Sequence, residues 1–488
     1  MKSRELILPT ALIVLLPMIS CSGLKNKSCT DCTTTPTVSI SIYDTPPAGG
    51  TVLSFTLPIA GISLSPSSGS PISVYSPTTL VPTELTHLQT DSALLVTAAQ
   101  IPADSYTSIN VTVGATSGVF INANPNQATI TGSNVSCAYG KVCDLPTGAA
   151  TTVNVPLKLT VSNLNQWIGL NVNLNNAIVT TNNTITVDFM QPNVLTATTT
   201  PRVDIPTNAV DTIEDFTGKV TAMTGSSITV QSGITGQSIT ATVNSGTQFD
   251  SVPTDYSKCV SAQSCVSVGS VVSLDALLSS SGILTATEID TLDATATDEV
   301  EGILYSASNT GEVAMILADK YSASEKGLLA PSEITYGTEI FLTASPSAVY
   351  VIDAKTLSSL PPFIGFSGSG DLRAGQQVRV QVSDMTSSSS GLSATADNVA
   401  LRFSRINGSI GSVAANNFTL TGYPAYIGLL NPLLGTSPFV YTYSPNTIFD
   451  GVTGTGDPKF VTGTPVAVRA LYLDNTQPPF AAAKVRVP

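Results

Sequence analysis

The chain has 488 residues, more than a single domain of typical size, which has about 100–150 residues. Hydrophobic residues make up 42% of the chain, enough for buried cores, whereas charged residues make up only 11%. The formal net charge is −13, and no dense run of Lys and Arg occurs. Because nucleic-acid binding depends on basic side chains that neutralise phosphates, this composition excludes nucleic acid as a partner.

The N-terminal segment has the pattern of a secretory signal peptide. Lys2 and Arg4 precede the apolar run Leu6–Leu16, which is shorter than the about 20 residues needed to span a bilayer. The junction before Cys21 resembles the lipobox of bacterial lipoproteins. That resemblance implies removal of residues 1–20, acylation of Cys21 with chains such as palmitate, and attachment to the outer membrane. An ordinary cleaved signal peptide and a retained anchor are the alternatives.

The six other cysteines form three close pairs in the sequence. Disulfides within these pairs would each close one short loop, as is usual in an oxidising compartment. The first pair also has redox or zinc spacing, but neither a βαβ context nor a second nearby cysteine pair accompanies it. The pairs are Cys29 with Cys32, Cys137 with Cys143, and Cys259 with Cys265.

The region that follows is predicted to be a β-sandwich. Residues 21–36 are polar and rich in Thr, which indicates a flexible tether. Over residues 37–200, short segments such as Val38–Ile42 alternate apolar and polar residues and are separated by turns, as half-buried strands are. The region resembles a bacterial family called domain of unknown function 4382. The segments Ile42–Pro46, Ile101–Val113 and Trp167–Leu174 carry that resemblance.

The rest of the chain repeats one pattern three times, over residues 213–295, 298–402 and 403–488. Each copy has a Gly-containing opening strand, a segment ending in Asp, a Gly before a Val-rich strand, and a closing strand. The repeats resemble domain of unknown function 5666, which implies small β-barrels of oligonucleotide/oligosaccharide-binding type. The complete prediction is all-β: an N-terminal β-sandwich followed by three small β-barrel-like repeats. Pro465 lies inside one Val-rich strand, which predicts an edge or bulged strand there.

Few residues suggest chemistry. His87 is the only histidine, and no nucleophile elbow accompanies it, so a loop-packing role is favoured. Glu288, Asp290 and Asp293 belong to an acidic cluster that could bind calcium, although a solvated acidic linker is the simpler interpretation. The glycines between residues 365 and 375 lack the Gly-Lys-Ser/Thr ending of a phosphate-binding loop.

One aromatic group is a candidate ligand platform. Phe439, Tyr441 and Tyr443 alternate, so their rings are expected on one face of a strand. Such rings can stack on sugars, whereas core packing is the more common role of aromatic residues in strands.

These observations predict a lipid-anchored, extracytoplasmic binding or structural protein of the bacterial cell envelope, with no catalytic site and no cofactor. Polysaccharide or another envelope protein is the expected partner, and the membrane is contacted through the lipid. The alternatives are a carbohydrate-active enzyme with two carboxylates and repeats that act only as spacers. Which face of the outer membrane carries the domains is left open.

Overall fold

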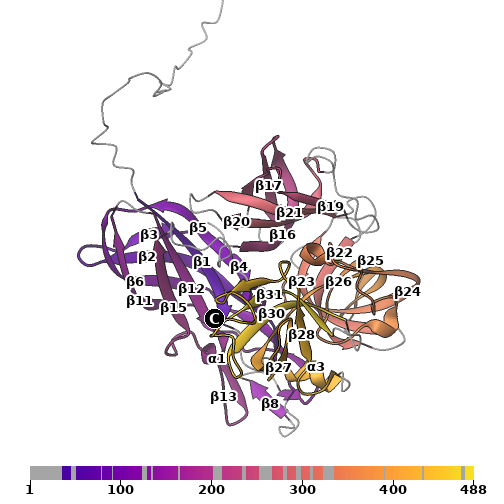
Figure 1. Ribbon diagram of the computed structural model, residues 1–488. Helices are drawn as coiled ribbons and strands as arrows, with labels where there is room; N and C mark the ends of the chain where they lie inside the picture. Colours follow the sequence, from indigo (N-terminus) through magenta and orange to yellow (C-terminus); the bar gives the residue numbers. More distant parts are fainter. Residues whose placement is uncertain are drawn as a thin grey trace, which may run out of the picture. The chain divides into compact units, whose positions relative to one another are not determined.

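In the computed structural model, the first part of the chain folds as β-sheets packed around one hydrophobic core (Figure 1). The first sheet has the order β15 (Leu195–Pro201), β12 (Gln166–Asn173), β1 (Thr37–Thr45) and β5 (Ala93–Gln100), and β1 pairs in parallel with β12. Both faces of β1 are covered. Even Ser41 is fully buried, and the indole Nε1 of Trp167 donates a hydrogen bond of 3.1 Å to its hydroxyl.

The structure describes the chain in segments. They are residues 36–45, 51–77, 80–90, 92–123, 129–132, 136–162, 165–201, 212–232, 238–251, 266–278, 283–292, 298–307, 312–321, 335–388, 391–430, 434–473 and 479–487. Within these segments, no helix has the length and the apolar character needed to cross a membrane.

The second sheet of this domain is larger and shares the core with the first. Its order is β10 (Val142–Asp144), β7 (Ser117–Ile121), β2 (Val52–Pro66), β6 (Asp104–Val113) and β11 (Thr151–Val161), with β3 (Ile72–Tyr75) and β4 (Val81–Glu84) also paired to β2. A small third sheet contains β13 (Ile178–Thr181), β14 (Thr184–Val187), β8 (Thr129–Gly132) and β9 (Ser136–Ala138). The short helices η1 (Leu85–Leu88) and α1 (Leu174–Ala177) complete the domain.

The next segment closes a small barrel, here called barrel 1. Its strands are β16 (Thr212–Met223), β17 (Ser227–Ser232), β18 (Ser238–Thr242), β20 (Val271–Leu278) and β21 (Leu284–Leu292). β16 pairs with β17 and β20, β17 with β18, and β21 with both β18 and β20, so the five strands form a closed circuit. β19 (Gln248–Ser251) adds a parallel pairing to β21.

Barrels 2 and 3 close by the same circuit and share one long strand. Barrel 2 has β22 (Asp298–Ala307), β23 (Glu312–Tyr321), β24 (Glu339–Ile352), β25 (Gln377–Ser388) and the first half of β26 (Gly391–Val413). Barrel 3 has the second half of β26, β27 (Asn417–Thr421), β28 (Phe439–Thr442), β30 (Pro465–Tyr472) and β31 (Phe480–Arg486), with β29 (Ile448–Asp450) beside β31. β26 changes its antiparallel partner from β25 to β30 between Arg402 and Phe403.

Short helices connect the strands of barrels 2 and 3. They are η4 (Lys355–Leu357), η5 (Ser369–Asp371) and α3 (Ala425–Leu430).

Repeated glycines have one structural reason in all three barrels. Gly269, Gly375 and Gly463 precede the Val-rich strands with φ of 99°, 96° and 87°, a region that favours glycine because it has no Cβ. Of the two alternatives predicted for the strand that contains Pro465, the structure shows the bulged one, because the pairing of β30 with β31 shifts register after Arg469. Pro465 is the first residue of β30, and β30 pairs on both sides with β26 and β31, so it is not an edge strand.

One face of each barrel carries residues at matching positions but with different charge. The matching follows from a bulge in the closing strand of each barrel, where β21, β26 and β31 have one extra residue opposite the step after Asp275, Gln381 and Arg469, respectively. Three residues define this face in each barrel: the residue before the register shift, its cross-strand partner, and the residue two positions after that partner. We call this set the charged face of the barrel. Barrel 1 has Asp275, Glu288 and Asp290; barrel 2 has Gln381, Asn398 and Ala400; barrel 3 has Arg469, Lys484 and Arg486.

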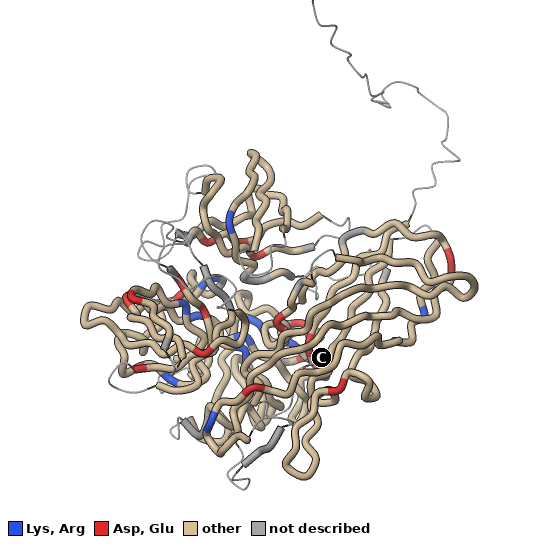
Figure 2. The backbone as a smooth tube through the Cα atoms, turned by 180° about the vertical axis from the view of Figure 1, so that it is seen from behind, with Lys and Arg blue, Asp and Glu red and all other residues tan. Residues whose placement is uncertain are grey.

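The acidic face of barrel 1 is buried against cations of barrel 2. Lys355 Nζ lies 3.3 Å from Asp275 Oδ2 and 3.6 Å from Asp290 Oδ2, and Arg402 Nη1 lies 3.7 Å from Asp290 Oδ2. Arg402 also pairs with Asp353 and, at 3.7 Å, with Glu301. Figure 2 shows how sparse charged residues are along the backbone, yet several of them meet in this buried group.

Replacing Arg402 with Met should destabilise the protein by about 3–5 kcal/mol, because buried carboxylates lose a cationic partner while the side-chain volume is largely kept. Urea unfolding followed by intrinsic fluorescence measures the change. Lys219→Met, at an exposed position of barrel 1, is the control and should change stability by less than about 0.5 kcal/mol. Equal effects of the two substitutions would contradict a stabilising role of the buried network.

Candidate ligand-binding site

Two of the three alternating aromatic residues face outward on barrel 3. Phe439 is 44% exposed and Tyr441 is half-buried, whereas Val440 between them points into the core. Their ring centroids are 6.2 Å apart. Phe439 pairs across the strands with Thr419 and Tyr441 with Asn417. The Asn417 amide therefore lies beside the Tyr441 ring, whereas the Thr419 hydroxyl is buried and accepts a hydrogen bond of 2.8 Å from the Ser412 backbone N–H. We call Phe439 and Tyr441 the aromatic pair.

The third aromatic residue does not join this pair. Tyr443 lies beyond the end of β28, and its ring packs edge-on against Phe363, with centroids 6.0 Å apart, at the border of the barrel 2 core. Burial raises the pKa of the Tyr443 phenol. The alternation that places Phe439 and Tyr441 on one face ends with the strand, so Tyr443 has a packing role.

A groove of about 950 Å³ is lined by residues adjacent in sequence to the aromatic pair and its cross-strand partners. It begins at Asn416 and Thr442, the neighbours in sequence of Asn417 and Tyr441. Its other wall is the Gly- and Thr-rich segment 451–457, which is held in place by hydrogen bonds such as that from Thr455 Oγ1 to the carbonyl of Ala415, at 2.7 Å. This wall carries the hydroxyls of Thr453 and Thr455 and the carboxylate of Asp457.

Two carboxylates also line the groove, Asp450 and Asp457. Asp450 lies 3.6 Å from the guanidinium Nε of Arg486. Asp457 accepts hydrogen bonds from the backbone N–H groups of Lys459 and Thr453, both at 2.9 Å, and these bonds lower the pKa of its carboxyl group. A general acid requires the opposite shift, so Asp457 is arranged as a loop-stabilising acceptor.

The calcium candidates have a different environment from the one expected of an acidic linker or an ion site. Glu288 and Asp290 lie on β21 in the buried charged face of barrel 1, where Asp290 faces Lys355 and Arg402. Asp293 lies outside the described residues. Among the residues that are described, no group of three or more His, Cys, Asp or Glu side chains is placed to hold a metal ion.

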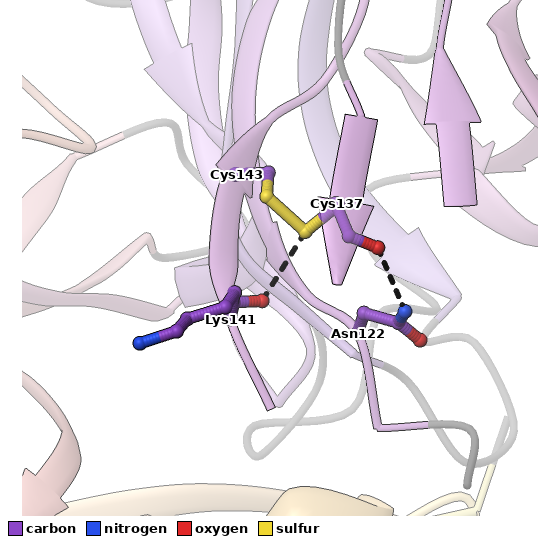
Figure 3. The surroundings of a disulfide bond; sticks show 4 residues. All are labelled: Asn122, Cys137, Lys141 and Cys143. Atoms are coloured by element: carbon purple, nitrogen blue, oxygen red, sulfur yellow. Dashed lines mark hydrogen bonds between the residues drawn. A yellow bond between two sulfur atoms is a disulfide. The ribbon is translucent and has the colours of Figure 1, made fainter. Parts of the chain in front are cut away.

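The structure contains a disulfide between Cys137 on β9 and Cys143 on β10. Figure 3 shows that it closes a hairpin that carries Lys141, and that the side-chain amide of Asn122 donates to the Cys137 carbonyl at 3.0 Å. The other cysteine candidates, Cys21, Cys29, Cys32, Cys259 and Cys265, lie outside the described residues.

His87 and the glycine-containing loop have no catalytic surroundings. His87 lies in η1 and lines a small cavity of about 50 Å³ together with Gln89, Asn407 and Tyr426. The loop at residues 365–375 contains η5 and leads into β25. A hydrogen bond of 2.7 Å from the Ser367 backbone N–H to the Asp371 carboxylate stabilises its turn.

Sequence analysis missed two buried acids of the first domain. Glu84 accepts hydrogen bonds from Ser54 Oγ at 2.6 Å, from the Phe55 backbone N–H at 2.8 Å and from Thr86. Asp44 is fully buried at the end of β1. Asp44 lies within the segment Ile42–Pro46, which carries the first family resemblance. Neither its burial nor the hydrogen-bond donors around Glu84 leave a signal in a single sequence.

These acids lie near the last strand of barrel 3. The Arg486 guanidinium sits over the Tyr43 ring, 4.5 Å from its centroid, and donates to the Gln89 carbonyl at 3.2 Å. Burial raises the pKa of Asp44 well above its ordinary 3.8, although the positive charge of Arg486 acts in the opposite direction. The arrangement is structural, because these groups are buried and Arg486 is already engaged.

Comparison with known proteins supports both family resemblances. Residues 35–200 match a family model described as Domain of unknown function (DUF4382), and residues 217–290 match one described as Domain of unknown function (DUF5666). The second match covers most of barrel 1, while the likeness of barrels 2 and 3 to it rests on their strand pairing. A search of the curated proteins found no match for the chain.

Replacing Asp44 with Asn should stabilise the protein at pH 7. Because the raised pKa makes folded Asp44 hold its proton more tightly than the unfolded chain does, its contribution is complete below pH 3.8 and is lost as pH rises through the folded pKa. The Asn variant has no charge to desolvate, so its advantage in urea midpoint should shrink as the pH is lowered towards 3.8. If the stability of the wild type relative to the variant instead increases as the pH is raised from 4 to 7, this prediction is contradicted.

Proposed function

We propose that this protein is a lipid-anchored, extracytoplasmic binding protein of the bacterial cell envelope that recognises polysaccharide through barrel 3. The observation that supports this most directly is the aromatic pair, which barrel 3 presents outward although its core is filled by other residues. Exposing a large apolar ring to water is unfavourable in free energy, and a partner that covers the ring removes this cost. A sugar ring offers such a partner, because its C–H face stacks on aromatic rings.

The surroundings of the aromatic pair favour a neutral glycan. Sugar hydroxyls both donate and accept hydrogen bonds, which suits the Asn417 amide beside the Tyr441 ring. The net charge of −13 repels polyanions at low salt. The N-terminal pattern supports the envelope location, since a signal peptide followed by an acylated Cys21 would leave the β-domains outside the cytoplasm.

A carboxylate enzyme is the second candidate, because Asp450 and Asp457 line one groove. The partners of these carboxylates argue against it. Asp450 pairs with Arg486, and backbone hydrogen bonds lower the pKa of Asp457, which is the opposite of the shift that a general acid requires. Release of reducing ends from a bound polysaccharide, lost in an Asp450→Asn variant, would establish the enzyme and overturn the non-catalytic proposal.

Replacing both members of the aromatic pair with Ala should lower the affinity for a bound polysaccharide at least tenfold, since each stacked ring contributes about 1 kcal/mol beyond its burial. The measurement is depletion of the full-length protein, purified in detergent, by insoluble cellulose, xylan, starch or chitin. Ile364→Ala, which removes an apolar side chain that is 72% exposed on barrel 2, is the matched control and should bind like the wild type. Wild-type protein that none of these polysaccharides depletes, or a double variant depleted like the wild type, would overturn glycan recognition by barrel 3.

Replacing Cys21 with Ser should release the protein from the membrane. The acyl chains that anchor a lipoprotein attach through this cysteine, and several chains are needed for stable anchoring because each buried methylene contributes about 0.8 kcal/mol. Fractionation of cells that express the wild type or the variant, with fatty-acid labelling, measures the change. Ser22→Ala, which alters the next residue and retains Cys21, is the control and should leave anchoring intact. Membrane association of the Cys21→Ser variant equal to that of the wild type would contradict lipidation at this residue.

A further inference from the structure

Barrel 2 has an outward aromatic residue at the same position as the aromatic pair of barrel 3. Thr343 of β24 pairs with Thr395, and Tyr441 of β28 with Ala481; each partner directly precedes the alanine that comes just before the bulged residue of its closing strand. Phe341 and Phe439, two residues before Thr343 and Tyr441, therefore correspond. They are 38% and 44% exposed. Barrel 1 has Thr240 at this position, hydrogen-bonded to Thr229 at 2.9 Å.

Phe341 lines a groove of about 860 Å³ that combines two domains. Barrel 2 contributes Tyr305 from β22 and Glu339, Phe341 and Thr343 from β24. The N-terminal domain contributes Asn122 and the hairpin between Cys137 and Cys143, whose Tyr139 is 41% exposed and whose Lys141 also reaches the groove. The volume lies within the range of about 300–1,000 Å³ found for small-molecule sites.

The two walls are held at their spacing by a shared apolar cluster. Leu53, Val119 and Ile121 of the N-terminal domain pack in one buried group with Ile316 of barrel 2 and Tyr426 next to barrel 3. On the hairpin side, the disulfide and the hydrogen bond from Asn122 to Cys137 set the loop that carries Tyr139 and Lys141 (Figure 3). The groove is thus a gap between two fixed walls.

Hydrogen-bond acceptors, hydrogen-bond donors and aromatic rings line this groove. The Tyr305 hydroxyl donates a hydrogen bond to the Glu339 carboxylate, and burial raises the pKa of that phenol. The carboxylate oxygens of Glu339 supply hydrogen-bond acceptors on this wall of the groove. Lys141 supplies a donor on the opposite wall, and Phe341 and Tyr139 supply ring faces. Acceptors, donors and rings together are the requirements of a ligand with many hydroxyls and apolar C–H faces.

We propose that this groove is a second glycan-binding site, in which Phe341 stacks on the sugar chain and the disulfide-closed hairpin covers it from the other side. The proposal rests on the glycan recognition proposed for barrel 3. It makes the protein bivalent, so that one polysaccharide strand held at both sites is bound more tightly than either site alone permits. It also assigns the disulfide a positioning role, since Tyr139 and Lys141 lie inside the loop it closes.

The test is the stoichiometry of binding of short neutral oligosaccharides to the full-length protein, measured by isothermal titration calorimetry. The ligands are cellohexaose, xylohexaose, maltohexaose and chitohexaose, used one at a time. For a hexasaccharide that binds, we expect two molecules per chain in the wild type and one in Phe341→Ala. One is also expected in the Phe439→Ala, Tyr441→Ala double variant, which retains the groove. Phe341→Tyr keeps a ring and should keep both sites, and Ile364→Ala is the control for loss of an exposed apolar side chain.

The outcomes separate the two proposals. Binding of one hexasaccharide that is lost with the barrel 3 aromatic pair and unchanged in Phe341→Ala overturns the groove as a glycan site but leaves barrel 3 recognition standing. Absence of binding of every hexasaccharide and every polysaccharide overturns both. Thermal unfolding of each variant, unchanged within about 2 °C, shows that a loss of binding is local. A Phe341→Ala variant that unfolds is replaced by Thr343→Arg, which fills the groove from a neighbouring outward position and should remove the same site.

Discussion

Burial of charge against charge is the constraint on which the arrangement of the barrels depends. In a chain with so few charged residues, Asp275, Asp290, Lys355 and Arg402 are all removed from water at one contact between barrels 1 and 2. An isolated buried carboxylate costs several kcal/mol, so each barrel can bury its charged face only against a partner with complementary groups. Matching positions are acidic in barrel 1, neutral in barrel 2 and basic in barrel 3, which gives three similar modules three different packing preferences.

Because the charged face of each barrel is used for packing, ligands can reach only the other faces of the barrel. The charged face lies on the fourth and fifth strands of each circuit, and it is buried. Outward residues of the second and third strands are therefore the ones left accessible, and Phe341 and Phe439 occur there. Barrel 1 has Thr240, a residue without a ring, at the corresponding position. Within this repeated fold, the division between packing and proposed binding follows from which strands bear charge and which bear aromatic residues.

Local patterns predicted much of this. The repeated Gly before each Val-rich strand marked the same turn three times, because a left-handed backbone conformation is open mainly to glycine. Alternation placed Phe439 and Tyr441 on one face, since side chains alternate across a strand. The same reasoning was wrong for Tyr443, because the strand ends at Thr442 and a ring from barrel 2 is close by. It also assigned Glu288 and Asp290 to a solvated linker, although both are buried.

The sequence by itself determined the all-β class, the two family resemblances and the existence of three related repeats, because strand alternation, turn residues and repeated order are properties of neighbouring residues. Only the tertiary structure decided which charges meet, which aromatic rings remain exposed and which segments face each other across the groove. Asp290 and Arg402, or Phe341 and Tyr139, are far apart in the chain. The barrels bring these residues close together when they close and pack. Burial then sets the free-energy cost of each charge, which the residue type alone does not give.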